Sequence, residues 1–332
     1  MISIKSEIVK DAILKYKSEI ENQRLNAYNN LVSLRNSGLS KEEIAYVDKI
    51  IKEFKTNNIL IGKFSYLNKV KKRVGVVPVN NKIKTKENRD KRRTAFKDKI
   101  LTSLGYKDLR TLFYPKYFKE IGIKACVYCN SQLAVSIDVE EHLKTKIKTK
   151  VKAKFQVDHY LAKDEYPFLS ISLFNLYPAC ASCNIAKSKI QIKEFKLYSE
   201  AKNILPSKYH FHFQAGCVAD YLTTFDIEKI KVLFVDPDKP DRTKFIKGSF
   251  QDTFDIEGIY DTQKDVAEEI IIKAQIYNDS FKQKLIDDFP DFFPNKNFID
   301  RMLLGNYTEE ENIHKRPMAK YMQDIAKELG LK

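Results

Sequence analysis

The chain has 332 residues, of which 43% are hydrophobic, and its 59 lysines and arginines against 44 aspartates and glutamates give a formal net charge of +15. This apolar content supports a folded core, and 10 glycines and 10 prolines are too few for a fibrous or disordered chain. No run approaches the roughly 18 consecutive apolar residues of a membrane span, and charges interrupt the N-terminal stretch where a signal peptide would be apolar. We therefore expect a cytoplasmic protein with no membrane partner.

The positive charge is concentrated in the first two thirds of the chain. Residues 1–110 carry 26 basic and 12 acidic side chains (+14), residues 111–200 carry 14 and 9 (+5), and residues 201–332 carry 19 and 23 (−4). A polyanion such as nucleic acid would therefore contact the first two thirds. The acidic last third is where we expect a partner protein or a structural role.

Helical periodicity dominates the N-terminal part. Residues 5–36 place apolar side chains at helical spacing, and Ser40 followed by Glu43 is a capping box that opens a second helix, ending near Phe54. These two helices predict a hairpin. Residues 69–99 then hold 13 basic and three acidic residues, which suits either a solvated linker or a phosphate-contacting segment, followed by a short helix from Arg93 to Leu104.

The C-terminal third combines short strand-like runs with amphipathic helices. We expect strands at 209–213, 230–235 and 245–260, and helices at 262–286 and 317–330.

Four of the five cysteines form two Cys-x-x-Cys pairs, Cys126 with Cys129 and Cys180 with Cys183. Two such pairs suit a closed tetrahedral site for structural Zn²⁺, because each presents two thiolates to one ion. Disulfides are the competing interpretation, but a reducing compartment argues against them. A redox role suits one pair better than two.

Between the two cysteine pairs, and just before Asp158 and His159, lysine alternates with Thr, Ile, Val and Ala, which is the period-two pattern of a strand with one basic face. Such a strand is either a sheet edge protected by charge or a surface that faces phosphates. The alternating lysines are Lys144, Lys146, Lys148, Lys150, Lys152 and Lys154.

A set of polar residues between and behind the cysteines suits phosphodiester cleavage. His159 titrates near neutral pH and can act as a general base, while the Asp158 carboxylate and the Asn184 amide oxygen suit Mg²⁺. Lys187, one helical turn after Asn184, could reach a phosphate. Because adjacent residues on a strand face opposite sides, the strand must end, bulge or twist at Asp158 and His159 if both face one substrate.

Together these residues resemble the HNH endonucleases of the ββα-metal fold, in their zinc-stapled form, over about residues 111–200. The resemblance implies a one-metal nuclease with His159 as general base, Asp158 and Asn184 as ligands of Mg²⁺ or Mn²⁺, and Asn175 bracing the loop that orients the imidazole. Asparagine rather than histidine at the third signature position favours oxygen ligation and leaves the choice of divalent ion open. The matching residues are Cys126, Cys129, Asp158, His159, Asn175, Cys180, Cys183 and Asn184, with Lys187 behind them.

A longer string, residues 157–170 followed by 175–180, is similar to the HNH subunits of Septu-type bacterial anti-phage systems, which work beside an ATPase partner. This resemblance implies an effector nuclease of antiviral defence with a possible ATPase partner subunit. The usual substrate of the HNH family is duplex DNA.

We therefore expect an α+β chain in four parts: a helical hairpin module (1–68), a basic nucleic-acid-contacting segment (69–110), a zinc-stapled ββα-metal nuclease domain (111–200), and an acidic, mixed but mostly helical module (201–332). The alternative is a zinc-stabilised nucleic-acid-binding or interaction subunit that cuts nothing. Convergence of Asp158, His159 and Asn184 on one exposed cleft would discriminate between the two. The predicted nucleic-acid contacts are Lys187, Lys150, Lys152, Lys154, Arg92 and Arg93.

Overall fold

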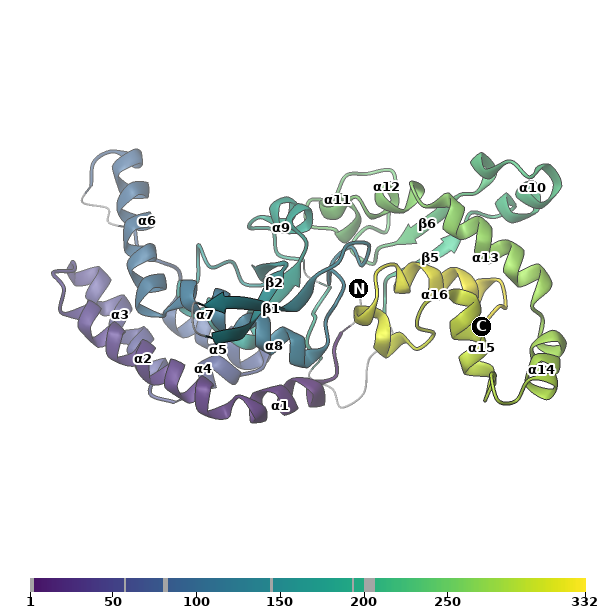
Figure 1. Cartoon of the computed structure of the whole chain (residues 1–332). Coiled ribbons are helices and arrows are strands. Elements are labelled where there is room, and N and C mark those ends of the chain that lie inside the picture. Colours follow the sequence, from purple (N-terminus) through teal and green to yellow (C-terminus); the bar gives the residue numbers. More distant parts are fainter. Residues whose placement is uncertain (1–2, 57, 80–82, 144–145, 193, 200–206) are drawn as a thin grey trace.

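A computed structural model describes residues 3–56, 58–79, 83–143, 146–192, 194–199 and 207–332. The fold is α+β, with helices in the majority and three two-stranded antiparallel sheets in the described ranges. The molecule is elongated, with an N-terminal lobe up to residue 199 at one end and a C-terminal lobe from residue 207 at the other (Figure 1). Within the described ranges, no helix has both the length and the apolar character needed to cross a membrane.

The N-terminal lobe begins with helices that enclose a common core. The predicted helix over 5–36 is in fact two, because the chain turns at Tyr16, whose ring packs edge-on against Phe113 at 5.6 Å. The predicted capping box is confirmed: Ser40 Oγ accepts from the Glu43 N–H at 3.3 Å, and Glu43 Oε2 accepts from the Ser40 N–H at 2.9 Å. The helices are α1 (Ser6–Lys15), α2 (Lys17–Arg35), α3 (Lys41–Glu53), α4 (Asn58–Ile61), α5 (Phe64–Val74), α6 (Lys86–Ser103), α7 (Tyr106–Leu112) and α8 (Tyr114–Ile121).

The basic segment is part of this lobe, which corrects the predicted boundary between residues 68 and 69. Helix α5 runs through that boundary, and α6 begins at Lys86, earlier than the predicted Arg93. Val70 of α5 and Phe96 of α6 are buried in the same core. The segment is therefore anchored by its apolar side chains, and much of its charge lies on the outer face of packed helices.

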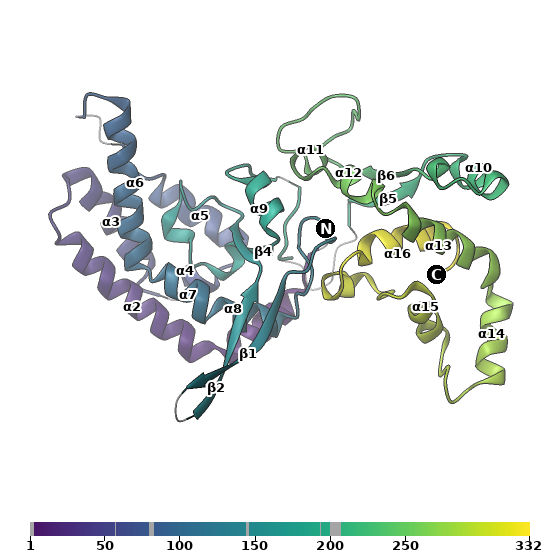
Figure 2. The same cartoon turned by 45° about the horizontal axis from the view of Figure 1, so that its top comes forward.

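The centre of the chain forms two hairpins and a helix. Strand β1 (Val135–Leu143) pairs with β2 (Lys146–Lys154), which confirms the strand that the alternating lysines predict; Lys144 lies outside the described residues. Strand β3 (Gln156–His159) then pairs with β4 (Leu176–Ala179), and α9 (Ala181–Lys187) follows directly. Two 3-10 turns, Pro167–Leu169 and Leu173–Asn175, lie in the loop between β3 and β4. In Figure 2 the tip of the β1–β2 hairpin projects from the body of the lobe.

The C-terminal lobe confirms two of its three predicted strands. The third prediction, a strand at 245–260, is wrong: the chain becomes helical at Phe250, because the Ser249 hydroxyl caps a helix there by accepting from the Asp252 N–H at 3.1 Å. The predicted helix over 262–286 is split into two. The elements are β5 (His210–Phe213), α10 (Cys217–Thr224), a 3-10 turn (Ile227–Lys229), β6 (Val232–Val235), α11 (Phe250–Phe254), α12 (Ile256–Asp261), α13 (Lys264–Ile276), α14 (Asp279–Asp288), α15 (Lys296–Leu304), a 3-10 helix (Glu310–Lys315) and α16 (Ala319–Glu328).

Candidate metal centre and active site

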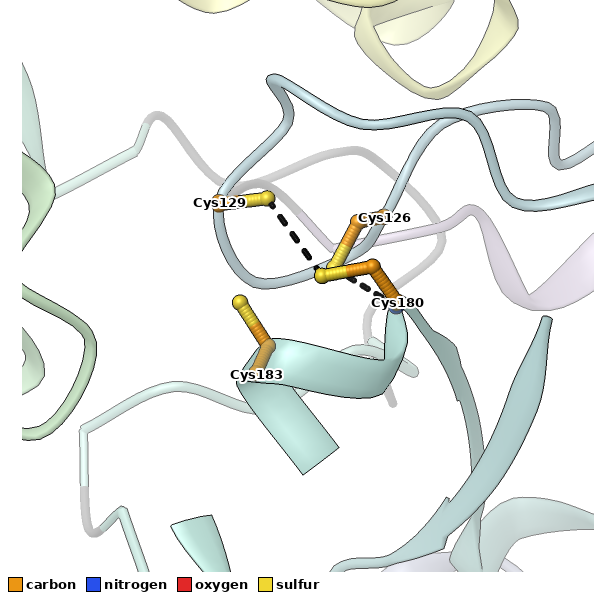
Figure 3. A group of neighbouring side chains, drawn as sticks. All are labelled: Cys126, Cys129, Cys180 and Cys183. Carbon is orange, nitrogen blue, oxygen red and sulfur yellow. Dashed lines mark hydrogen bonds between the residues drawn. The ribbon is translucent and has the colours of Figure 1, made fainter. Parts of the chain in front are cut away.

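The two cysteine pairs converge on one point. Cys126 and Cys129 lie in the loop before β1, Cys180 is the N-cap of α9, and Cys183 lies on that helix (Figure 3). All four Sγ atoms lie within 4.8 Å of one another, and those of Cys129 and Cys180 are 4.0 Å apart. A tetrahedral Zn²⁺ site with Zn–S bonds of about 2.3 Å has sulfur atoms about 3.8 Å apart. The donor set and its spacing therefore fit a structural zinc ion.

The thiols of this cluster do not share one pKa. Hydrogen bonding with the Cys126 thiol, first among several contacts, lowers the pKa of Cys129 to about 7 and also lowers that of Cys180. Burial raises the pKa of Cys126. A bound cation favours the thiolate form of every ligand. Metal binding would therefore release protons from the thiols whose pKa is raised, such as that of Cys126.

The four-cysteine centre lies where the two lobes meet. Asn130, next to Cys129, is fully buried in a left-handed conformation, and its side chain donates to the Ile313 carbonyl and accepts from the Lys320 N–H, both at 3.0 Å. The Tyr260 hydroxyl donates to the Cys129 carbonyl at 2.9 Å. A metal ion bound by the four cysteines would therefore order a loop that makes hydrogen bonds with the C-terminal lobe.

Asp158 lies on β3 with its carboxylate turned into the protein. It accepts a hydrogen bond from Tyr128 (Oη–Oδ2, 2.5 Å) and pairs with Lys187 (Nζ–Oδ2, 3.0 Å). Asp158 is 5% exposed and Lys187 is 1% exposed. Burial raises the pKa of Asp158, and the attraction of Lys187 and the hydrogen bond from Tyr128 oppose this shift.

His159 is the last residue of β3. The strand therefore ends at the position where it must end, bulge or twist if Asp158 and His159 are to face one substrate. The Nε2 atom of His159 lies 3.1 Å from the Ser170 carbonyl oxygen. A carbonyl only accepts, so Nε2 carries the proton and Nδ1 keeps a free lone pair. Burial, followed by the charge of Lys163, lowers the pKa of His159 to about 3. The imidazole is therefore neutral at pH 7, in the form that can accept a proton.

Asn175 ties together the loop between β3 and β4. Its Oδ1 accepts from the Leu161 N–H at 2.7 Å, and its Nδ2 donates to the carbonyls of Leu161 at 3.1 Å and Leu169 at 3.0 Å. Leu169 directly precedes Ser170, whose carbonyl holds the imidazole of His159. This is the position that a bracing role requires.

Asp158, His159 and Asn184 meet at one cavity of about 200 Å³, but Asp158 and His159 are buried, so the structure meets the criterion of convergence and not that of an exposed cleft. The amide nitrogen of Asn184 donates to Gln156 (Oε1, 2.5 Å), which leaves the amide oxygen for another contact. Oxygen donors and room for several waters suit Mg²⁺, although a cation at Asp158 would share that carboxylate with Lys187. The cavity is lined by Val157, Asp158, His159, Ala162, Lys163, Asp164, Asn184, Ser188 and Lys189.

Two predicted phosphate contacts, Lys187 and Arg92, form ion pairs with carboxylates of the protein. Lys187 is buried because it lies four residues after the metal ligand Cys183, on the inward face of α9. Arg92 forms a bidentate ion pair with buried Glu43, with Nε and Oε1 2.8 Å apart. This pair connects α6 to α3. The prediction for Lys187 is wrong, because this lysine is buried and is not accessible to a phosphate in this structure. Arg92 stabilises the fold through Glu43, and its side chain is 39% exposed.

The remaining predicted contacts are accessible to different degrees. Arg93 is half-buried, and among the described residues its Nε atom has no hydrogen-bond partner. Lys150 and Lys152 lie 3.8 and 3.5 Å from Glu141 on the neighbouring strand, and Lys154 is exposed. Both interpretations of the lysine strand, protected edge and phosphate-facing surface, are compatible with this geometry.

Sequence analysis missed the cations that actually line the cavity. Lys163 lies over the Tyr106 ring at 5.0 Å, and Lys189 lies 3.3 Å from Asp164, which also pairs with Lys97 at 2.9 Å. Lys163 follows His159 by four residues and Lys189 follows Lys187 by two, so proximity in the sequence was the available signal. Tyr128, inside the first cysteine pair, was missed as well.

Comparisons with models of protein families, with curated proteins and with solved structures found no match to this chain.

Proposed function

We propose that the chain is a metal-dependent endonuclease of the HNH type, which hydrolyses phosphodiester bonds of nucleic acid, most readily duplex DNA. The observation that carries the proposal is the meeting of Asp158, His159 and Asn184 at one cavity beside a four-cysteine centre. These side chains come from β3 and α9 of a strand–strand–helix unit, the arrangement expected of a ββα-metal core.

His159 acts as the general base in this proposal. Its Nδ1 lone pair takes a proton from a water molecule, which attacks the phosphorus atom while the bond to the leaving oxygen breaks. The Ser170 carbonyl holds the imidazole in the required tautomer through Nε2, and Asn175 fixes the loop that presents this carbonyl. Removal of the imidazole should therefore abolish cleavage without removing DNA binding.

Asp158 and Asn184 would hold the catalytic Mg²⁺ or Mn²⁺. A bound divalent cation supplies positive charge for the phosphate oxygens and the leaving oxygen. The carboxylate oxygen of Asp158 and the amide oxygen of Asn184 are hard donors of the kind that this cation prefers. Lys163 and Lys189 at the cavity would contact flanking phosphates.

Plasmid nicking tests the proposal. Purified zinc-loaded protein should nick supercoiled plasmid with Mg²⁺ or Mn²⁺, and omission of the divalent ion should stop the reaction. His159→Ala should lose nicking while it retains zinc and DNA binding. His210→Gln is the matched control, because this exposed histidine lies on β5 in the other lobe. Metal-dependent nicking that survives in the His159→Ala variant would refute the assignment of the base.

A second function is favoured by one specific observation: the Asp158 carboxylate already has two buried partners, Tyr128 and Lys187. A carboxylate satisfied in this way can be purely structural, as in a zinc-stabilised nucleic-acid-binding or interaction subunit that cuts nothing. DNA binding without Mn²⁺ binding or nicking would favour this second function.

We further propose that the nuclease is the effector of an anti-phage system and works with a partner such as an ATPase subunit. The similarity of residues 157–170 to Septu-type subunits supports this proposal. Exposed apolar side chains in the C-terminal lobe offer a surface for a partner. Addition of the partner should raise nicking, and deletion of α14 and α15 should remove that increase. The exposed side chains are Ile276, Phe281, Phe289, Phe292, Phe298 and Met302.

A further inference from the structure

We infer that Tyr128 is a positioning residue that couples the four-cysteine metal centre to the Asp158 carboxylate and sets the affinity of the active site for its divalent cation. The inference rests on the proposed function. It names a residue outside the cavity lining, which acts on the cavity only through Asp158.

Tyr128 has little freedom to move. It stands between Cys126 and Cys129, so two metal ligands flank it in the same loop. Its side chain is fully buried, and its ring stacks on Phe254 with centroids 4.6 Å apart and planes 21° apart. A metal ion that fixes the loop therefore also fixes the phenol.

Asp158 is contacted by one residue from each of the two elements that carry the cysteine pairs. Tyr128 reaches it from the loop of the first cysteine pair, and Lys187 reaches it from α9, the helix that carries Cys183. Cys183 and Lys187 are four residues apart and therefore lie on one helical face. An ion bound by both cysteine pairs joins the two elements that hold the carboxylate.

The two oxygens of Asp158 are not equivalent. Oδ2 accepts from Tyr128 at 2.5 Å and lies 3.0 Å from the ammonium of Lys187, whereas the contact of Oδ1 with Lys187 is longer, at 3.3 Å. Oδ1, which lacks the hydrogen bond from Tyr128, is therefore the oxygen more available to a divalent cation in the cavity. Without the Tyr128 hydroxyl, Oδ2 loses its hydrogen bond, and the carboxylate can rotate and shorten the contact of Oδ1 with Lys187, which would weaken cation binding.

Replacement of Tyr128 by phenylalanine tests this coupling, because it removes the hydroxyl and keeps the ring. Tyr128→Phe should raise the dissociation constant for Mn²⁺, measured by electron paramagnetic resonance, by about 10- to 100-fold, the usual effect of losing an outer-shell partner. The half-saturating Mg²⁺ concentration for nicking should rise in parallel. Its maximal rate at saturating Mg²⁺ should change only a few-fold, and its zinc content should be unchanged.

Tyr260→Phe is the matched control. Tyr260 is also buried and donates to the same loop, at the Cys129 carbonyl, but no contact within the described part of the chain joins it to Asp158. Its Mn²⁺ affinity should equal that of the wild type. Equal shifts in both variants would mean general loosening of the loop and would overturn the inference, as would an unshifted Tyr128→Phe.

Failure of the inference and failure of the proposed function give different results. If the wild type binds Mn²⁺ and nicks DNA but Tyr128→Phe does so equally well, only the inference fails. If the wild type binds no Mn²⁺, both fail. Should Tyr128→Phe not fold, 3-fluorotyrosine at this position keeps the ring and the hydroxyl, adds one small fluorine atom and makes the hydroxyl a stronger donor; unchanged Mn²⁺ affinity would then refute the coupling.

Discussion

Acidification should destabilise the wild-type protein through His159, and His159→Gln should remove that effect. Burial holds the pKa of His159 at about 3 in the folded state, whereas an unfolded chain has the ordinary value of about 6.5. Between these values the unfolded state binds more protons than the folded state. This contribution to the free energy of unfolding is therefore fully present above pH 6.5 and is lost as the pH falls toward 3.

The size of the effect follows from the pKa difference. At pH 5 the unfolded imidazole is almost fully protonated, and the folded one is still neutral. The pH lies about 1.5 units below the unfolded pKa, and each unit corresponds to about 1.4 kcal/mol, so the loss between pH 7 and pH 5 is about 2 kcal/mol. Because His159 is only 4% exposed, solvent screening reduces this figure little.

Urea unfolding followed by circular dichroism at pH 7, 6 and 5 measures the loss. Zinc should be present and Mg²⁺ absent, so that only the imidazole differs between the proteins. Glutamine keeps a donor for the Ser170 carbonyl but does not titrate, and exposed His210→Gln serves as the control. The difference in unfolding free energy between the wild type and His159→Gln should fall by about 2 kcal/mol over this range. Parallel pH dependences would mean that His159 titrates normally, and the argument for a neutral base at this site would be lost.

Three further predictions follow from other contacts. Removal of the metal by a chelator or by Cys180→Ser should loosen the junction of the lobes, so that limited proteolysis separates them; unchanged protection would contradict a linking role for the centre. Lys163→Ala should weaken DNA binding for all sequences and reduce the slope of log affinity against log salt by about 1 in fluorescence anisotropy, whereas an unchanged slope would exclude a phosphate contact. Arg92→Ala should lower the free energy of unfolding in urea by about 1–3 kcal/mol, because it leaves buried Glu43 without its ion-pair partner. It should not change the slope of log affinity against log salt; a reduced slope would show that Arg92 contacts phosphate.

Elements with strong local signals could be predicted from the sequence. The α3 helix carries both halves of its capping box, and the alternating lysines of β2 have the period of a strand. The sequence predicts a strand at 245–260, a stretch that contains many aromatic and β-branched side chains. Phe250 and Phe254, however, are four apart and face one core as α11, behind the Ser249 cap. At this position the helical spacing of the two phenylalanines and the Ser249 cap outweigh the strand propensity of the individual residues.

The four-cysteine cluster could be predicted because each Cys-x-x-Cys spacing can present two thiolates to one point, and two such pairs complete a tetrahedral donor set. The burial of Lys187 depends on how α9 docks, yet Cys183 four residues earlier was a usable signal, since a ligand of a central ion must face inward. Tyr128 and Asp158 are 30 residues apart and meet only in the folded chain. No spacing rule connects them, so their contact could be found only in the structure.

The loop of the first cysteine pair makes hydrogen bonds both with the C-terminal lobe and with the candidate active site. Tyr260 of that lobe bonds the carbonyl of Cys129, and Asn130 bonds the backbone at Ile313. In the same loop, Tyr128 bonds the Asp158 carboxylate. A partner that shifts the C-terminal lobe would therefore act on the loop that holds a predicted ligand of the catalytic cation. If the chain is the proposed nuclease and a partner binds the C-terminal lobe, a structural metal ion at the four-cysteine centre would give the protein a physical means to make cleavage depend on assembly.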